Sequence, residues 1–280
     1  MMRGMFAAIS GLKNHQVMLD VTANDIANVN TIGYKSARVT FQDSLNQMQR
    51  GASAPAGQNA GSNAAQIGLG VGLGSIDNLM TGGAVQTTGN PLDVAIQGEG
   101  FFQIGQGDPT NPIAPTAYTR AGNFSINSEG WLATQTGQYV LGYAVDAAGN
   151  AAGPERAILI PPGATGVAID QSGGVSYIDP ATQTRVTPFR LTLATFNNNA
   201  GLERAGANQW VPSPNSGTKT VRTPGQDGLG VTTAGAIEMS NVDLASTFTS
   251  MITAQRGFQA NSRVISTSDE MLQDLVNLKR

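Results

Sequence analysis

The C-terminal stretch of the chain, residues 244–278, reads LASTFTSMITAQRGFQANSRVISTSDEMLQDLVNL. Apolar residues recur in it at alternating steps of three and four, which places them on one stripe of an α-helix, as in a coiled coil. Every seventh residue of this stripe is apolar: Leu244, Met251, Phe258, Ile265 and Leu272. The spacing predicts a helix over 244–278, with Asp243 or Asn241 as its N-cap.

The N-terminus carries the same pattern. The alternating three and four spacing runs through Met2, Met5, Ile9, Leu12, Gln16, Leu19, Ala23 and Ile26. Asn28, Asn30 and Gly33 then supply residues that typically end helices. A second helix is therefore predicted over 3–29.

The two predicted helices are poor in charge, because only Arg256 and Arg263 are charged between positions 244 and 268. A helix with one solvent-exposed side usually carries charged residues there. The two helices are expected to pair as a coiled coil, either as a hairpin within one monomer or as a pair completed only by neighbouring copies. The expected assembly interface is Met5, Ile9, Leu12, Leu19, Ile26, Leu244, Phe248, Met251, Phe258, Ile265 and Leu272.

The middle of the chain reads as short β-strands separated by turns rich in Gly, Asn and Ser. Strand candidates lie at 92–96, 101–104, 118–126, 131–143, 157–160, 166–169, 175–178 and 189–196. Many short strands of this kind favour an antiparallel sandwich or an open barrel. The predicted fold class is α+β, with N- and C-terminal helices pairing as a coiled coil and a central, mainly antiparallel β domain.

The composition changes between these parts. The stretch from Gly51 carries no charged residue before Asp77 and is rich in Gly, Ala, Ser, Asn and Gln, which is typical of a flexible segment. The predicted domains are an N-terminal helix of an inner coiled-coil domain at 1–33, a Gly/Ala-rich linker region at 34–76, a central β domain at 77–232 and a C-terminal helix of the inner domain at 233–280.

Composition also narrows the functional classes. Charged residues make up 12% of the 280 residues, against a usual value of about 25%. So little charge indicates that much of the surface is covered by copies of the chain or by partners. The net charge of −3 argues against nucleic acid as a partner. No stretch approaches the roughly 18 apolar residues that span a membrane, and residues 1–16 do not resemble a cleaved signal peptide.

Candidate chemistry is sparse. The chain has no Cys and one His, so a disulfide framework, a thiol nucleophile and a Cys- or His-rich metal site are excluded. Gly68, Gly70, Gly72 and Gly74 lack the spacing of a dinucleotide-binding loop and instead predict an extended segment that another backbone approaches closely. Asp269 and Glu270 are neighbours on a helix and do not face one site. No catalytic residue, cofactor or metal ligand is predicted.

Four ordered motifs give the chain a family resemblance. They are LDVTANDIANVNTIGYK at 19–35, DVAIQGEGFF at 93–102, YTRAGNF at 118–124 and, near the C-terminus, MSNVDL at 239–244 with MITAQRGF at 251–258. Together they resemble the axial proteins of the bacterial flagellum, the rod and hook family. The segments RVTFQD at 38–43 and MLQDLVNLKR at 271–280 look most similar to a hook protein, with a distal rod protein as the alternative.

This resemblance implies a structural role. A hook subunit would polymerise helically into the flexible joint that passes motor torque to the filament, whereas a distal rod subunit would form the stiff drive shaft. Terminal helices would pair around a central channel, and the β domains would form outer layers. A third interpretation is an adhesin or secreted β-domain enzyme with helical ends.

The resemblance also implies partners and a location. The partners would be further copies of the chain, the distal rod, hook cap and hook–filament junction proteins, and the flagellar type III export apparatus. The chain would lie in the extracellular hook or basal body after export without a cleaved signal peptide. Neither nucleic acid binding nor membrane insertion is expected.

Overall fold

A computed structural model describes residues 2–55, 61–146, 151–226 and 228–278. The chain divides into two units. The first unit contains Met1–Ala27, Ala37–Asn78 and Asp243–Arg280, and the second contains Asn28–Ser36 and Leu79–Val242. The predicted α+β class is confirmed, since one helix stands at each end of the chain and the strands between them pair mainly antiparallel.

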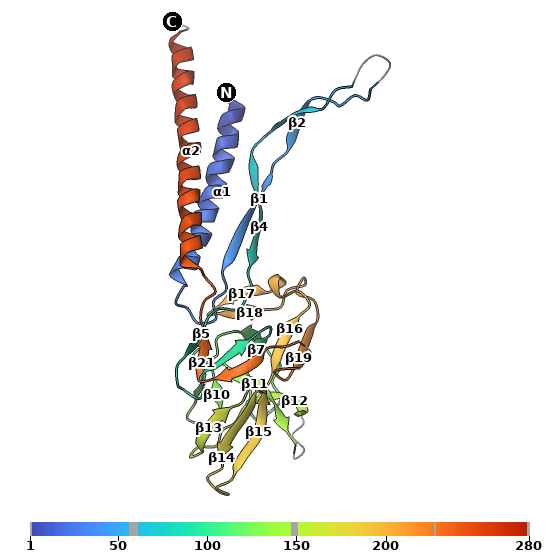
Figure 1. Cartoon of the computed structure of the whole chain (residues 1–280), viewed down its shortest axis with the longest axis vertical. Helices are drawn as coiled ribbons and strands as arrows, with labels where there is room; N and C mark the ends of the chain where they lie inside the picture. Colours follow the sequence, from blue (N-terminus) through green and yellow to red (C-terminus); the bar gives the residue numbers. More distant parts are fainter. Residues whose placement is uncertain (1, 56–60, 147–150, 227, 279–280) are drawn as a thin grey trace. The chain divides into compact units, whose positions relative to one another are not determined.

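The first unit is built on two long helices that lie side by side (Figure 1). Helix α1 spans Met2–Ala27 and α2 spans Leu244–Asn277, within a few residues of the predicted bounds. Asp243 is the N-cap of α2, because its carboxylate accepts a hydrogen bond of 3.0 Å from the backbone N–H of Ala245. That bond pairs one of the donors that a helix N-terminus leaves free.

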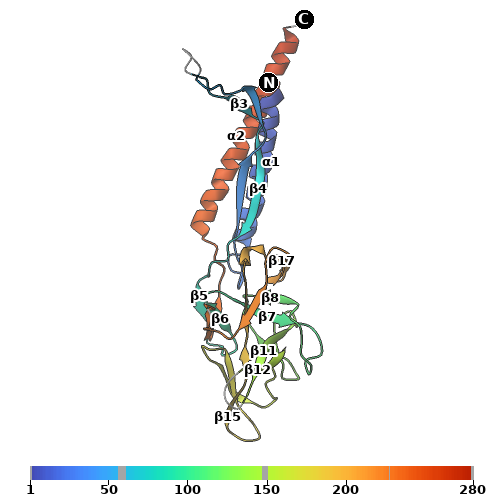
Figure 2. The ribbon, with the colours of Figure 1, turned by 90° about the vertical axis from the view of Figure 1, so that its right-hand side faces the viewer.

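An extended hairpin completes this unit, and its part formed by residues 37–43 and 71–78 lies along α1 (Figure 2). Strand β1 (Ala37–Asp43) pairs antiparallel with β4 (Val71–Asn78), and β2 (Asn46–Arg50) pairs with β3 (Ala65–Gly68). Thr40 and Ser75 face each other across β1 and β4, with their hydroxyl oxygens 2.7 Å apart. The described part of 51–76, which was expected to be flexible, thus includes the paired strands β3 and most of β4, because cross-strand hydrogen bonds order a sequence whose composition alone favours flexibility.

The second unit is a β body. Its main sheet, within the described residues, has 13 strands and a central order β13-β14-β15-β11-β7-β8-β18-β17. The pairs β20–β6 and β21–β5 lie beside it. The strands of this unit are β5 (Val85–Thr87), β6 (Val94–Gln97), β7 (Phe101–Gly105), β8 (Ala117–Thr119), β9 (Ser125–Ile126), β10 (Leu132–Ala133), β11 (Tyr139–Val145), β12 (Ala151–Ala157), β13 (Thr165–Ile169), β14 (Gly174–Ile178), β15 (Arg185–Leu191), β16 (Leu193–Phe196), β17 (Glu203–Gly206), β18 (Gln209–Val211), β19 (Lys219–Arg222), β20 (Val231–Ala234) and β21 (Ala236–Glu238).

Two of the predicted strands are longer than the strands of the structure. The candidate at 131–143 splits into β10 and β11, because Gly137 takes a positive φ of 82° in a turn between them. The candidate at 118–126 likewise splits into β8 and β9. Strand β12 overlaps the candidate at 157–160 only at Ala157, and β5 and β17 to β21 are not among the predicted strands.

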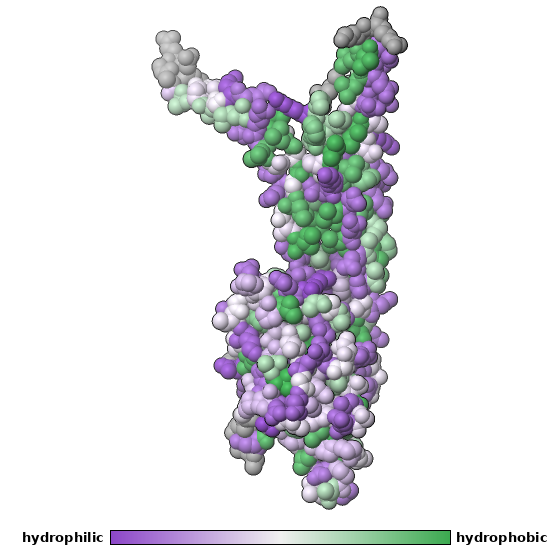
Figure 3. All heavy atoms as spheres, turned by 180° about the vertical axis from the view of Figure 1, so that it is seen from behind, coloured by the Kyte–Doolittle hydropathy of each residue, from purple (hydrophilic) through white to green (hydrophobic). Residues whose placement is uncertain are grey.

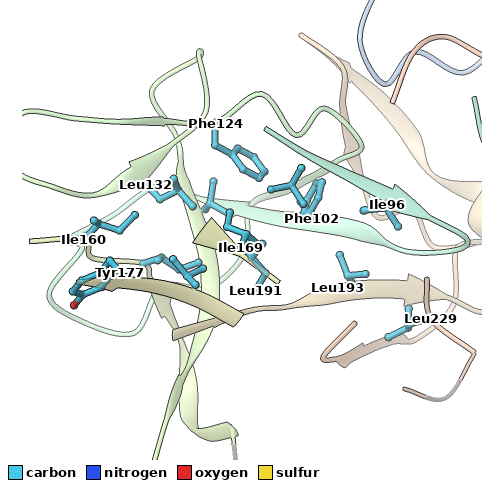
Figure 4. Packing of buried hydrophobic residues seen from close by; sticks show 14 residues of the cluster. Ile96, Phe102, Phe124, Leu132, Ile160, Ile169, Tyr177, Leu191, Leu193 and Leu229 are labelled. Carbon is cyan, nitrogen blue, oxygen red and sulfur yellow. The ribbon is translucent and has the colours of Figure 1, made fainter. Parts of the chain in front are cut away.

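The core of the β body is a cluster of aliphatic and aromatic side chains (Figure 4). Phe102 and Phe124 meet edge to face, with ring centroids 5.1 Å apart, and Leu132, Leu191 and Leu193 are fully buried beside them. A second cluster contains Tyr118, Phe196 and Trp210. Burial of this apolar surface stabilises the body.

Candidate assembly surfaces

Small residues form the contact between α1 and α2. A Cβ atom on Gly11 would lie 2.6 Å from Nδ2 of Asn261, and a Cβ atom on Gly257 would lie 2.5 Å from Nε2 of His15. Ala254, which is fully buried, belongs to the same seam of α2. At each glycine the end of a polar side chain from the other helix occupies the space that a Cβ would need, so the two glycines let Asn261 and His15 pack directly on the opposing helix backbone.

The structure divides the eleven residues predicted for the interface into two groups. Most of them are half-buried in the single chain: Met5, Ile9, Leu12, Leu19, Ile26, Met251, Phe258, Ile265 and Leu272. Leu244 and Phe248, near the start of α2, are exposed.

The inward face of α2 is rotated from the predicted heptad stripe. The predicted alternation of three and four also runs from Phe248 through the heptad a positions Gln255, Ser262, Asp269 and Val276, and these four residues are all exposed. The buried or half-buried positions instead include Ala254, Asn261 and Ser268, one residue earlier in each repeat. The face of α2 toward α1 therefore combines these positions with the half-buried Met251, Phe258, Ile265 and Leu272, and the exposed positions lie outside it.

The hairpin is held against α1 by polar side chains. Nδ2 of Asn14 donates to the carbonyl of Val71 at 2.7 Å, and Oγ of Ser10 accepts from the N–H of the same residue at 3.2 Å. The rings of His15 and Phe41 meet edge to face at 5.9 Å. Sequence analysis missed this contact, although small and polar residues at steps of three or four along α1 (Ala7, Ser10, Gly11, Asn14) were a visible signal for it.

One of the alternating glycines, Gly70, is closely approached by another segment, as predicted. Gly70 has a φ of +120°, and its Cα lies against Ala7 and Ser10 of α1. Gly72 and Gly74 continue the extended backbone of β4.

Large apolar side chains remain exposed on the first unit, and green areas gather over the helices and hairpin in Figure 3. On the helices they are Met2, Phe6, Leu244, Phe248, Ile252, Val264, Met271, Leu275, Val276 and Leu278. On the hairpin they are Phe41, Leu45, Met48, Ile67, Leu69, Leu73 and Ile76. An apolar surface of this extent is typical of a face that binds other protein.

The described residues contain no group of three or more His, Asp or Glu side chains placed to hold a metal ion. Asp269 is exposed and accepts a hydrogen bond of 3.2 Å from Gln273. In the described part of the chain, no helix is both long and apolar enough to cross a membrane.

Three family models match the chain. They are described as flagella basal body rod protein (residues 5–35), flagellar hook protein FlgE/F/G D1 domain (95–177) and flagellar basal body rod FlgEFG protein C-terminal (233–278). The first and last matches cover most of α1 and all of α2, and the second lies in the β body.

Relatives of this chain include flagellar rod and hook proteins. The flagellar basal-body rod protein FlgG of Bacillus subtilis is 46% identical over 281 residues, and that of Caulobacter vibrioides is 38% identical over 281 residues. These alignments cover 100% and 99% of this chain and 100% of each relative. The flagellar hook protein FlgE of Borreliella burgdorferi is 28% identical over 447 residues, with 100% of both chains covered. The chain is therefore a structural protein rather than an enzyme, and it belongs to the flagellar rod and hook protein family.

Proposed function

We propose that this protein is a subunit of the distal rod, the stiff shaft of the flagellar basal body. The proposal rests on the lengths of the relatives and on their sequence identity with this chain. The rod relatives align with this 280-residue chain over 281 residues, whereas the hook relative needs 447. A hook protein of that length carries long segments that this chain lacks. The rod interpretation, placed second in the sequence analysis, is thus favoured over the hook.

The exposed apolar surface of the first unit supports a polymeric role. Side chains such as Phe248 and Ile252 are about half exposed in the single chain, at 49% and 50%. Contacts with neighbouring copies would bury them, at a gain of about 25 cal/mol for each Å² of apolar surface removed from water. In this proposal α1 and α2 pair as a coiled coil completed by neighbouring helices, and the eleven predicted interface residues line these contacts.

The proposed layers follow the two units. The helices α1 (Met2–Ala27) and α2 (Leu244–Asn277) form the inner coiled-coil layer, the hairpin strands β1 and β4 pack on α1, and the β body forms the outer layer. Open helical polymers arise from head-to-tail contacts that do not close into a ring. The proposed partners are further copies of the chain, neighbouring rod and hook-region proteins and the export apparatus, and the proposed location is the basal body.

A pair of complementation strains tests rod against hook. The chain is expressed in Bacillus subtilis lacking its rod protein FlgG and, separately, in the same strain lacking its hook protein. We expect swimming to return only in the first strain, with straight, rigid tubes formed by the purified protein in electron micrographs. Rescue of the hook-deficient strain, or curved and supercoiled tubes, would transfer the assignment to the hook.

A further inference from the structure

The chain passes between its two units four times. The crossings fall after Ala27, after Ser36, after Asn78 and after Val242. On the side of the second unit, three short segments receive them: Asn28–Ser36, the residues following Leu79, and the residues from β21 to Val242. Any force that passes from one unit to the other along the chain must enter through these segments.

Asn241 ties the three segments together. Its Oδ1 accepts from the N–H of Ser36 at 2.7 Å, and its Nδ2 donates to the carbonyl of Leu79 at 2.9 Å and to Oγ1 of Thr81 at 3.0 Å. The N–H of Leu79 in turn donates to the carbonyl of Ser36 at 2.9 Å. One amide side chain therefore bonds to the first two segments from its place in the third.

Buried charges join the same segments a second time. Nζ of Lys35 donates to Oε1 of Glu238 at 2.6 Å and to the carbonyl of Thr81 at 2.8 Å. Oε1 of Glu238 also accepts from the N–H of Gly83 at 2.9 Å, and Oε2 pairs with Nη1 of Arg120 at 3.2 Å. The side chains of Lys35 and Glu238 are 0% and 1% exposed, and that of Arg120 is 3% exposed.

Thr81 is shared between the two sets, because its carbonyl accepts from both Lys35 and Asn241. The first segment is further fixed to the β body. Arg204 donates to the carbonyl of Lys35, and its guanidinium lies over the rings of Tyr34 and Trp210 at 4.9 and 5.3 Å. These contacts anchor the first segment to the core of the body, where Trp210 is packed.

Burial lowers the pKa of Lys35 below its usual value, although the Glu238 carboxylate opposes this shift. Buried ion pairs of this kind add little net stability compared with apolar side chains of the same volume. Their hydrogen bonds are directional, however, and they allow one register where apolar contacts would allow sliding. The cluster is therefore suited to fixing the positions of the three segments.

We propose that Lys35, Thr81, Glu238 and Asn241 form a clamp that couples the three segments mechanically. The hydrogen bonds that hold the three segments then break and re-form together. A force that enters through α1, β1, β4 or α2 is distributed over all three segments. The joint opening of the three segments is a property of the single chain. The claim that this coupling stiffens a shaft rests on the proposed rod function.

Hydrogen exchange of the full-length protein tests joint opening. The variant Asn241→Ala removes direct bonds at Ser36, Leu79 and Thr81. We expect at least tenfold faster exchange not only at Ser36 but also at Gly33 and Gly83, whose N–H groups bond to Glu238. Acceleration confined to Ser36 and Leu79 would overturn the clamp.

Two further variants make the result specific. Asn198→Ala is the matched control, because Asn198 bonds to the carbonyl of Asn215 elsewhere in the body and should leave Gly33, Ser36 and Gly83 unchanged. Glu238→Gln keeps the shape of the side chain but removes its charge. We expect it to accelerate hydrogen exchange at the same three amides as Asn241→Ala, whereas faster exchange at different amides in the two variants would contradict the clamp.

Thr81→Val is the replacement variant if Asn241→Ala unfolds the whole unit. It removes a single side-chain hydrogen bond, the one between Oγ1 of Thr81 and Nδ2 of Asn241.

The mechanical role has a separate readout. Filaments of the Asn241→Ala variant are expected to have a persistence length at least twofold shorter than wild-type filaments in electron micrographs. Unchanged stiffness, with the exchange result as expected, would remove the mechanical role and leave the clamp as a folding feature. Failure of the wild-type chain to form filaments would count against the proposed function, and the exchange experiment would still decide the clamp.

Discussion

Gly70 illustrates how one residue permits a contact between elements. It lies just before β4, with a φ of +120° and its Cα against α1. A side chain there would meet Oγ of Ser10 and Cα of Ala7. Glycine tolerates both the positive φ and the missing space, whereas other residues tolerate neither.

We expect Gly70→Ala to lower the free energy of unfolding of the first unit by about 1–3 kcal/mol, since it combines backbone strain with a steric clash. Gly72→Ala is the matched control. A Cβ atom at position 72 would make an ordinary contact of 3.8 Å with Gln42, so this change should be neutral or stabilising by up to about 1 kcal/mol. Denaturant titration followed by circular dichroism measures both, and equal effects would contradict the close approach.

Tyr118 makes the folding stability of the β body depend on pH. Burial, assisted by the charge of Glu155, raises the pKa of its hydroxyl to about 12. The folded state therefore favours the neutral phenol more than the unfolded state does. The stability that this group contributes is complete below pH 10, the ordinary pKa, and is lost as the pH rises through 12.

The variant Tyr118→Phe should accordingly show a smaller loss of stability between pH 10 and pH 12 than the wild type. Burial also raises the pKa of Tyr143 and Tyr177, so the difference between variant and wild type, rather than either curve alone, reports on Tyr118. Thermal unfolding at several alkaline pH values gives this difference. Parallel curves would mean that Tyr118 titrates normally in the folded protein.

At the level of elements, α2 has two faces with different tasks. Its inner face uses Ala254, Gly257 and Ser268 to approach α1, and larger apolar residues such as Ile252 and Val264 remain exposed. An isolated helix of this composition would be only marginally stable, because most helical stability in proteins comes from packing. Packing on α1 supplies part of it, and the proposed neighbours supply the rest.

Phe258→Pro should break α2 near its middle, at a cost of about 3 kcal/mol or more, because proline lacks the N–H donor and clashes with the preceding turn. We expect polymerisation to fail while Trp210, buried in the β body, keeps its native fluorescence. Phe258→Ala removes the ring but keeps the helix, and it should reduce polymerisation much less. Filaments of normal stability from Phe258→Pro would show that α2 is not an assembly element.

The whole chain combines few charges with a large exposed apolar surface on its first unit. Charged residues are 12% of the sequence, and side chains such as Phe6 and Phe248 are 59% and 49% exposed. A soluble monomer with these properties tends to associate. Self-assembly is the association that the proposed function requires.

The double variant Phe248→Ser with Ile252→Ser should raise the critical concentration for polymerisation at least tenfold. Both side chains are already half exposed in the single chain, so the free energy of unfolding of the monomer should change by less than about 0.5 kcal/mol. Thr253→Ser, on the same exposed turn, is the control. Light scattering against protein concentration measures the effect. A drop in monomer stability without a change in critical concentration would place these residues in the fold instead.

The sequence by itself determined the helices at the two ends, the β-rich middle and the flagellar family, because these depend on local periodicity, turn residues and motifs. It indicated a structural protein and placed the rod second to the hook. Comparison with relatives of matching length then favoured the rod.

Only the tertiary structure decided which face of α2 meets α1. A heptad stripe marks the apolar positions of a helix, but it does not show whether small residues at neighbouring positions also pack against the other helix. It also decided that residues 37–50 and 65–78 pair as a hairpin, since their strands are stabilised by hydrogen bonds to each other and by contact with α1 rather than by local preference. The cluster of Lys35, Glu238 and Asn241 was equally hidden. Lys35 and Glu238 are 203 positions apart, and only folding places their charges 2.6 Å from each other.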